Sequence, residues 1–430
     1  MPQPGWDAMM SVTAGRRVLG GNRDFLLLWS GAGLSFLASQ VTASAYSLIV
    51  LWTTGSVPAA GVVAFAAELP YFVMQLPAGL VADRFDRRRL MVLCDLGRVL
   101  AVGSIFTAML LGHFLLSQLV VVAFVEGSLS VLYRVAEAAA VPSVVPPELL
   151  SRAAARNEAR AQAAGVLGRP GAGLLATAAQ WAPFVFTAVA HVVSLGTLLL
   201  IRSELQEPRG GERQRVFAEL AAGLRWLWRQ KFARAAVGLI AVSNLLFQTL
   251  VLAMLVIVRA DGGSEAVASL VSTVAGAGGL LGAVSAPWWL RRVSLPVLVI
   301  GANAVWTMLV PLMAFVRDPV GLGGIFGAAA FVGAGWTVAV TAYLIQIVPD
   351  ELRGRVTSVG ALIAYGPAAF GHLLGGGMLN LLGVPATVLS VSGVMLLLTV
   401  VAVVSPGVRN PRSPDLPPME QDECRERMRR

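Results

Sequence analysis

Long uninterrupted runs of apolar residues dominate the chain, and short polar connections separate them. A helix needs about 20 such residues to cross the hydrocarbon core of a bilayer. The pattern predicts twelve membrane spans, at residues 25–52, 57–82, 90–112, 114–141, 157–179, 181–201, 235–259, 264–290, 295–316, 320–348, 356–380 and 383–405. Hydrocarbon requires helices or closed barrels, and continuous apolar runs lack the alternation of barrel strands. We therefore expect an all-α polytopic membrane protein.

The basic residues lie on one side of this topology. Of 33 Lys and Arg, all but six fall at the two ends or in the connections after spans 2, 4, 6, 8 and 10. Basic connections stay on the cytoplasmic side of a membrane. Both termini and the connection 202–234 are thus predicted to be cytoplasmic, in a protein of the cell membrane. The same asymmetry explains the net charge of +9 without a nucleic-acid partner.

The composition indicates that most of the chain is surrounded by lipid, and it limits the kinds of catalytic or metal site that the chain could form. Hydrophobic residues make up 56% of the 430 positions and charged residues 13%, against about 25% charged in soluble proteins. Two cysteines, one in a predicted span and one near the end of the chain, give no disulfide framework. The three histidines are far apart, and no metal-ligand cluster, cofactor motif or nucleophile–base set is present. We expect neither an enzyme nor a cofactor.

An internal repeat relates the two halves of the chain. Residues 145–152 (VPPELLSR) match residues 348–355 (VPDELRGR) at an offset of 203, and the same offset places Gly79 on Gly282. Repeats of this kind are typical of membrane proteins whose two halves have the same topology and are related by an axis along the membrane normal. We predict two six-helix bundles related by pseudo-twofold symmetry. The predicted division is a cytoplasmic segment 1–22, bundles 23–201 and 235–405, a linker 202–234 and a disordered cytoplasmic tail 406–430.

The linker contains an amphipathic pattern. Apolar residues between Phe217 and Trp228 recur at helical spacing, with arginines between them. The pattern indicates a helix that lies on the inner membrane surface. A helix docked against the protein itself explains the pattern as well.

The connection between the second and third spans is the most specific motif. Residues 79–89 read GLVADRFDRRR, and the spacing G-x-x-x-D-R-x-D-R-R-R resembles the signature loop of the major facilitator superfamily of secondary transporters. The resemblance implies that Asp83 latches the two halves together in the outward-open state, by capping a neighbouring helix or pairing with an arginine. The alternative is that the charges only set topology. The predicted latch comprises Gly79, Asp83, Arg84, Arg87, Asp95 and Arg98.

Further motifs resemble one branch of that superfamily. Residues 165–173 (GVLGRPGAG) resemble the glycine–proline motif of its exporters, with Arg169 where proline is usual. Residues 142–148, the linker and residues 34–40 resemble the branch that contains macrolide, drug and siderophore exporters. Members of that branch often have an acidic residue at the position of Gln40. The resemblance implies proton-coupled export.

Ionisable residues inside spans are costly and mark function. Glu68 and Glu126 lie near the middle of spans 2 and 4. A carboxylate without a partner in a low-dielectric site favours its protonated form, so Glu68 is the leading and Glu126 the second candidate for proton coupling. The alternative is a salt bridge to Arg134 or Arg160. Arg134 and Glu137 are three residues apart on span 4 and are predicted to pair.

The resemblance also implies a central cavity lined by spans 1, 4, 7 and 10. Besides Glu126, its predicted polar and aromatic lining is Gln40, Tyr46, Tyr133, Asn244, Gln248, Trp336 and Tyr343. The remaining wall is aliphatic, which suits hydrophobic or amphiphilic molecules better than sugars.

Three functions fit these observations. The first is a monomeric, proton-coupled exporter of hydrophobic or amphiphilic small molecules that works by alternating access. The second is an importer or lipid flippase of the same fold. The third, a non-transporting membrane receptor or scaffold, is disfavoured because the short connections present no surface outside the membrane. The expected partners are a small-molecule substrate, protons and the lipid bilayer.

Overall fold

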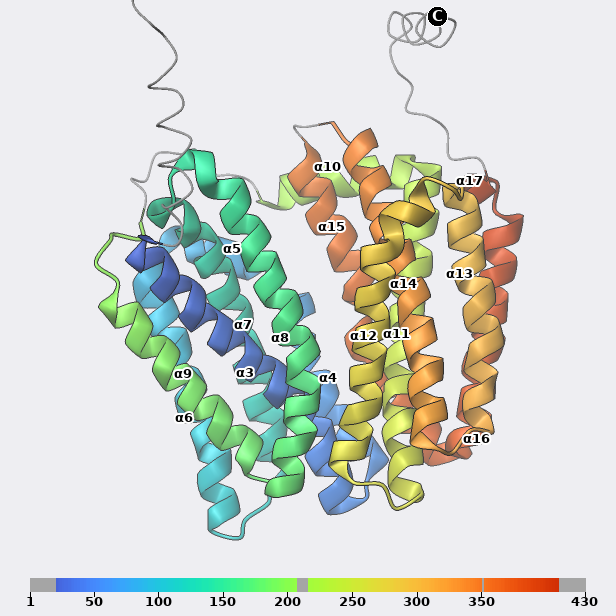
Figure 1. Cartoon of the computed structure of the whole chain (residues 1–430), viewed down its shortest axis with the longest axis horizontal. Helices are drawn as coiled ribbons and strands as arrows, with labels where there is room; N and C mark the ends of the chain where they lie inside the picture. Colours follow the sequence, from blue (N-terminus) through green and yellow to red (C-terminus); the bar gives the residue numbers. More distant parts are fainter. Residues whose placement is uncertain (1–20, 207–215, 350–351, 410–430) are drawn as a thin grey trace, which may run out of the picture. The chain divides into compact units, whose positions relative to one another are not determined.

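The computed structural model describes residues 21–206, 216–349 and 352–409. All regular elements within these ranges are helices (Figure 1). In chain order they are α3 (Arg23–Thr54), α4 (Val57–Val73), α5 (Gln75–Arg84), α6 (Arg87–Leu110), α7 (Leu116–Val144), η1 (Pro147–Leu149), α8 (Leu150–Ala178), α9 (Ala182–Leu200), α10 (Val216–Arg229), α11 (Lys231–Ala260), α12 (Glu265–Leu290), α13 (Leu295–Leu309), η2 (Val310–Ala314), α14 (Pro319–Ile347), α15 (Arg353–Tyr365), α16 (Ala368–Val404) and α17 (Pro406–Arg409).

Nine helical stretches in the described residues are long and apolar enough to cross a membrane. A tenth is formed if α4 and residues 77–84, which are bent by 61° against it, count as one broken span. The prediction of an all-helical membrane protein is confirmed at this level, whereas the number twelve stays a prediction.

Two of the predicted spans account for the difference between these ten candidates and the twelve predicted spans. Helix α8 covers residues 157–178 of the predicted span 157–179, but its glycines and charged residues such as Glu158, Arg160 and Arg169 lower its mean hydropathy. Residues 353–404 count as one candidate where two spans were predicted. A straight helix of 52 residues would rise about 78 Å, more than twice the roughly 30 Å of a hydrocarbon core. Gly383, with φ of 74°, breaks the helix between the two predicted spans.

Contacts between residues divide the chain into two compact units. Unit 1 comprises Met1–Gly210, Val251–Thr273 and Ala369–Leu381, and unit 2 comprises the remainder. Residues 251–273 and 369–381 fall in unit 1, so the units do not follow the predicted bundle boundaries. The division into two six-helix bundles therefore stays a prediction, and the terminal segments 1–22 and 406–430 lie almost wholly outside the described residues.

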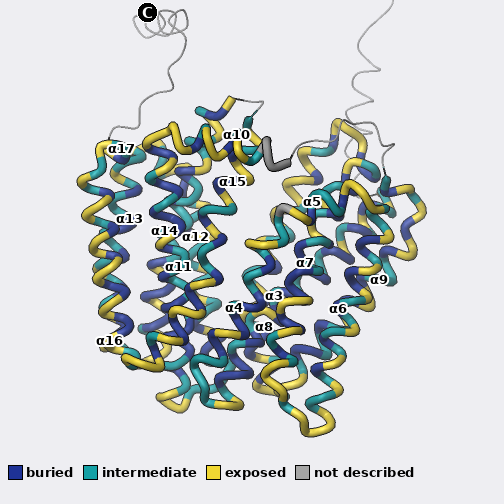
Figure 2. The backbone as a smooth tube through the Cα atoms, turned by 180° about the vertical axis from the view of Figure 1, so that it is seen from behind, coloured by how far each residue is buried: buried dark blue, intermediate teal, exposed yellow. Residues whose placement is uncertain are grey.

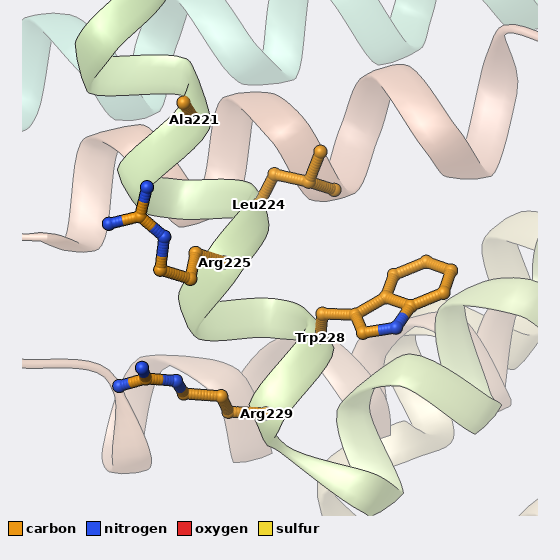
Figure 3. A pocket seen from close by; sticks show the side chains of 5 residues that line it. All are labelled: Ala221, Leu224, Arg225, Trp228 and Arg229. Carbon is orange, nitrogen blue, oxygen red and sulfur yellow. The ribbon is translucent and has the colours of Figure 1, made fainter.

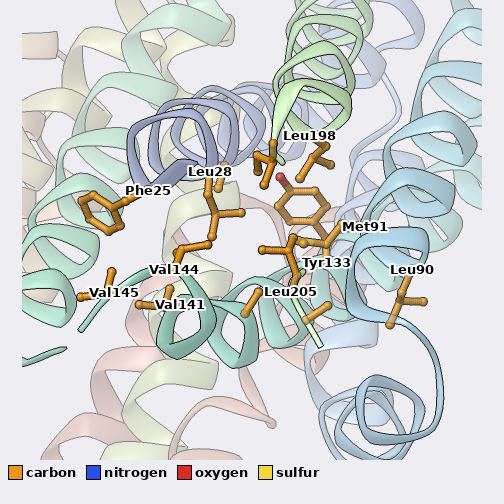
Figure 4. Close-up of a cluster of buried hydrophobic side chains, with 14 of the residues drawn as sticks. Phe25, Leu28, Leu90, Met91, Tyr133, Val141, Val144, Val145, Leu198 and Leu205 are labelled. Atoms are coloured by element: carbon orange, nitrogen blue, oxygen red, sulfur yellow. The ribbon is translucent and has the colours of Figure 1, made fainter. Parts of the chain in front are cut away.

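Helix α3 is at the centre of unit 1. It packs against α4, α7, α8 and α9, and α6 packs against α7 and α9. A cluster of buried apolar side chains joins the first turns of α3 and α6 to the ends of α7 and α9 (Figure 4); it includes Phe25, Leu28, Met91, Tyr133, Val141 and Leu198. A Cβ atom on Gly168 of α8 would overlap Gln40 of α3, so glycine permits the close approach of these helices.

Unit 2 contains a second set of closely packed helices. Helix α13 packs against α14 and α17, and α10 packs against α15. Glycine again permits close contact: a Cβ atom on Gly278 or Gly282 of α12 would overlap the backbone of α14. The helix predicted within the linker is present as α10, and it is docked against α15.

Large apolar side chains are exposed along the helices of both units. Exposed positions, yellow in Figure 2, recur along these helices. On α12, for example, Leu281 and Val284 are 64% and 72% exposed. Such stripes are unfavourable in water and are the expected surface of helices that face lipid.

Candidate functional site

A cavity of about 400 Å³ opens within unit 1, between α3, α4, α7 and α8. Its wall combines aromatic, hydroxyl and charged side chains. The polar and aromatic lining residues are Ser35, Phe36, Ser39, Tyr71, Arg98, Ser130, Tyr133, Arg134, Glu137, Asn157, Glu158 and Arg160. Small-molecule sites combine apolar surface with convergent polar groups, and the polar share of this wall is large.

A buried ion pair lies behind one wall of this cavity. Arg98 and Asp95, one turn apart on α6, pair at 2.5 Å, and their side chains are 2% and 0% exposed. Ser194 of α9 donates a hydrogen bond to the other oxygen of Asp95 at 2.7 Å. The Arg98 guanidinium lies 4.6 Å from the centre of the Tyr133 ring. A buried charge pair is tolerated when its remaining polar atoms are satisfied, as they are here.

His191 of α9 extends the same network. Its Nδ1 lies 3.4 Å from Asp95 and 3.3 Å from the Ser35 hydroxyl of α3. The side chain is completely buried, and its Nε2 has no hydrogen-bond partner in the part of the chain that the structure describes. No pattern in the sequence singles out His191, because its partners come from helices far apart in the chain.

Glu126 of α7 is buried close to this network. Its carboxylate lies beside the hydroxyl groups of Ser39 and Ser130. Those hydroxyls bond each other at 3.0 Å, and Arg98 donates to Ser130 at 3.4 Å. One carboxylate oxygen of Glu126 has no hydrogen-bond partner among the described residues. Glu126 is therefore a buried acid that is only partly satisfied, and a group of this kind calls for an explanation.

Glu68, the other predicted proton carrier, has a different environment. Its carboxylate on α4 lies 3.3 Å from Nε2 of His372, which belongs to the segment of unit 1 at residues 369–381. The side chain of Glu68 is 34% exposed. The alternative drawn from the sequence, a salt bridge to Arg134 or Arg160, stays a prediction.

Glu137 pairs with Arg160, not with Arg134 as predicted. Two contacts of 3.1 and 3.2 Å join Arg160 of α8 to Glu137, and Arg160 also donates to the Trp29 carbonyl at 2.9 Å. Arg134 instead donates to Gln75 at 3.3 Å and lies over the Tyr71 ring at 5.2 Å. Spacing of three residues puts Arg134 and Glu137 on neighbouring faces of α7, but Glu137 faces α8 whereas Arg134 faces α4 and α5.

The residues of the predicted latch are divided between two places. Asp95 and Arg98 form the buried pair, whereas Asp83 and Arg84 are exposed at the end of α5. No hydrogen bond or ion pair of Asp83 is seen in the described ranges. The helix cap is Asp86, whose side chain accepts from the Arg89 amide at 2.8 Å. Arg87 donates to the Ala139 carbonyl of α7 at 2.8 Å.

Gly79, the first residue of the signature loop, lies within α5, with open space where a Cβ atom would be. The structure therefore gives it no close backbone approach. Its part in a latch stays a prediction.

The predicted cavity lining is spread over both units. In unit 1, Tyr133 lines the cavity described above, whereas Tyr46 is fully buried with its ring 5.9 Å from Phe184. Gln40 lies against α8 at Gly168. The other predicted residues, Asn244, Gln248, Trp336 and Tyr343, belong to unit 2.

In unit 2 these side chains have packing partners. Asn244 donates to the Ala364 carbonyl at 2.8 Å, and the Trp336 ring is 5.3 Å from that of Trp306. Tyr343 is 4.7 Å from Phe232, ring to ring. A shared substrate cavity therefore stays a prediction.

No group of three His, Cys, Asp or Glu side chains in the part of the chain that is described is arranged to hold a metal ion.

Curated relatives of this chain are efflux proteins. The multidrug efflux pump Tap of Mycolicibacterium fortuitum is 28% identical over 405 residues, which are 90% of this chain and 95% of that protein. Tap of Mycobacterium tuberculosis (strain ATCC 25618 / H37Rv) is 26% identical over 399 residues, 90% of this chain and 94% of that protein. Macrolide efflux protein A of Streptococcus pyogenes is 27% identical over 135 residues, 31% of this chain and 33% of that protein.

Solved transporters share the fold. The crystal structure of the nucleoside transporter NupG has a TM-score of 0.69 at 10% identity, covering 89% of this chain and 98% of that one. A bacterial homologue of the lysosomal transporter Spinster has a TM-score of 0.66 at 15% identity, covering 91% and 98%. Residues 28–364 match the Major Facilitator Superfamily. The signature loop, the helices of membrane-spanning length and this match agree, and the chain is an integral membrane protein that belongs to the Major Facilitator Superfamily.

Proposed function

We propose that the chain exports amphiphilic small molecules across the cell membrane in exchange for protons, by alternating access. The direction is supported by similarity over 90% of the chain to a protein named as a multidrug efflux pump. The observation that carries the coupling is the buried, partly satisfied carboxylate of Glu126, which lies beside Ser39 and Ser130 of the cavity wall.

The cavity suits amphiphiles because it offers both kinds of surface. Phe36, Tyr71 and Tyr133 give aromatic area, and Ser39 and Ser130 give hydroxyl groups that donate or accept. Several of its polar side chains already bond one another, such as Arg160 with Glu137 and Arg98 with Ser130, so a ligand with many hydroxyls would leave some of its own groups unpaired, at a cost for each.

Glu126 is the group through which we expect a proton and a substrate to compete. An ionised carboxylate with an unpartnered oxygen is costly in a site that is closed to water. The closed site therefore holds Glu126 protonated. When the site opens to water or a substrate with a donor or positive charge approaches, the proton leaves to water and the carboxylate takes the new partner. One carboxylate that holds either ligand but not both couples the two movements.

Other charged residues have supporting parts in this proposal. The Asp95–Arg98 pair holds Ser130 and Tyr133 in place, since Arg98 contacts both. Asp83 serves as the latch of the outward-open state, for which an exposed carboxylate is accessible. Glu68 and His372 form a second ionisable pair whose contact would change during the cycle. We also propose that the protein is a monomer with both termini in the cytoplasm.

Transport into inverted membrane vesicles tests the proposal. Vesicles that contain the protein, acidified inside by respiration, are expected to accumulate fluorescent amphiphiles, and nigericin, which collapses the pH gradient, should stop this accumulation. Accumulation equal to that of vesicles without the protein, for every member of a chemically diverse panel, would refute export. Accumulation that persists after nigericin would refute the proton coupling.

A further inference from the structure

Helix α10 has one face docked against the protein. It packs along α15, and a Cβ atom on Gly223 would overlap the backbone of Arg355. Leu227, one turn further on, is 2% exposed. Helix α10 is therefore held in a fixed orientation within unit 2, and its other face has a defined direction.

The opposite face carries two pairs of exposed side chains (Figure 3). Leu224 and Trp228, 42% and 61% exposed, project to one side of the helix, and Arg225 and Arg229 project to the other. Within each pair the residues are four apart, which places them one above the other on the helix surface. With Ala221 they line a shallow pocket of about 610 Å³. Cationic and apolar surface thus lie next to each other along two turns.

The two arginines have no acidic partner among the described residues. No ion pair of Arg225 or Arg229 is formed there, and a third cation, Arg234, lies 5.7 Å from the centre of the Trp228 ring. Cations gathered in this way repel one another unless an anion lies between them. This face therefore offers a place for an anion from outside the described chain.

The position of α10 next to a membrane span identifies the source of that anion. Only Gln230 separates Arg229 from α11, which is a candidate span whose apolar sequence begins near Ala235. At about 1.5 Å per residue, Arg229 lies within roughly 10 Å of the edge of the hydrocarbon. That depth corresponds to the headgroup layer of the bilayer, where tryptophan and arginine are both favoured.

We propose that this face of α10 binds an anionic phospholipid of the adjacent leaflet. The lipid phosphate lies between Arg225 and Arg229, whose planar guanidinium groups each donate paired hydrogen bonds to phosphate oxygens. The first part of an acyl chain lies along Leu224 and the ring of Trp228. Because α10 is fixed on α15, the bound lipid holds this end of unit 2 at the membrane surface. The inference is independent of the substrate and of the coupling ion.

Lipid titration of the full-length protein in detergent tests this proposal, with bound lipid counted by native mass spectrometry. Phosphatidylglycerol is compared with phosphatidylcholine of the same acyl chains. The unaltered protein is expected to bind phosphatidylglycerol more tightly. Each arginine lost weakens the binding of an anionic lipid by about fivefold, so R225Q/R229Q should weaken it by about 25-fold and leave phosphatidylcholine binding unchanged.

Matched variants separate this site from general surface charge and from misfolding. Arg152 and Arg156 are another exposed pair four residues apart, on α8, and R152Q/R156Q should bind phosphatidylglycerol as the unaltered protein does. R225K/R229K, which keeps the charge but loses the paired hydrogen bonds of the guanidinium groups, should bind phosphatidylglycerol with an affinity between those of the unaltered protein and R225Q/R229Q. If R225Q/R229Q is not monodisperse, the single changes R225Q and R229Q replace it, each with a loss of about fivefold.

Three results would overturn the proposal. The first is equal affinity of the unaltered protein for the two lipids. The second is an equal loss of phosphatidylglycerol binding in R152Q/R156Q. The third is displacement of phosphatidylglycerol by millimolar inorganic phosphate beyond the effect of a chloride solution of equal ionic strength, which would identify a site for a free anion.

Discussion

Replacement of Asp95 by asparagine keeps the shape of the side chain and leaves the buried Arg98 without its counter-ion. The pair is joined at 2.5 Å, with both side chains almost completely shielded from solvent. Ser194, which donates to Asp95 at 2.7 Å, loses a charged acceptor at the same time. The change therefore tests whether the network behind the cavity stabilises unit 1 as a connected whole.

The expected loss of stability is large. Removal of one partner from a buried ion pair costs about 3–5 kcal/mol, because the other charge stays buried and uncompensated. This corresponds to a rise of roughly two to four orders of magnitude in the equilibrium constant of unfolding. Asp95→Asn/Arg98→Gln removes both charges, so it should cost less than Asp95→Asn alone.

Unfolding by sodium dodecyl sulfate in mixed micelles measures these free energies. Glu204→Gln, at an exposed residue, is the control and should change the free energy of unfolding by less than about 0.5 kcal/mol. A loss below about 1 kcal/mol for Asp95→Asn, or a double variant less stable than the single one, would show that the pair does not behave as a buried charge pair.

Three further predictions concern the latch, the second carboxylate and the topology. Asp83→Asn should retain expression and lower transport steeply, whereas Asp86→Asn should matter less, because asparagine keeps the side-chain oxygen that accepts from the Arg89 amide at the start of α6; equal, mild effects on transport in vesicles would favour a role in topology alone. Glu68→Gln should retain counterflow of substrate, which needs no net proton movement, and lower accumulation driven by a pH gradient; accumulation at the full rate would exclude Glu68 from coupling. In a cysteine-free background, a cysteine at His113 should react with an impermeant reagent added to intact cells and one at Gly210 should not; the reverse labelling would overturn the orientation.

The helices could be predicted from the sequence because each apolar run is long enough to be a span. The predicted start of the eighth span, residue 264, differs by one residue from the start of α12 at Glu265. The bend between α4 and α5 was not predicted, although Pro70 and Pro77 lie on either side of it. Proline removes a backbone donor, and helices commonly kink beside it.

Partners in the site were harder to predict, because tertiary contacts decide them. Arg134 and Glu137 are three residues apart, a spacing at which side chains on one helix can pair, yet Glu137 pairs with Arg160 of α8. The contact between Glu68 and His372 joins residues from opposite halves of the chain. No periodic pattern or fixed spacing in the sequence predicts either contact. For the contact between Glu68 and His372, the only signal was a histidine within a predicted span.

Proton release driven by substrate is the most direct test of the central claim, that Glu126 exchanges a proton for a substrate. Purified protein in lightly buffered detergent solution is mixed with a transported amphiphile, and the pH is followed with an indicator dye. We expect an acid shift that saturates with substrate, together with substrate binding but no acid shift in Glu126→Gln, because glutamine imitates the protonated carboxylate and has no proton to release. An acid shift of equal size in the unaltered protein and in Glu126→Gln would contradict this assignment.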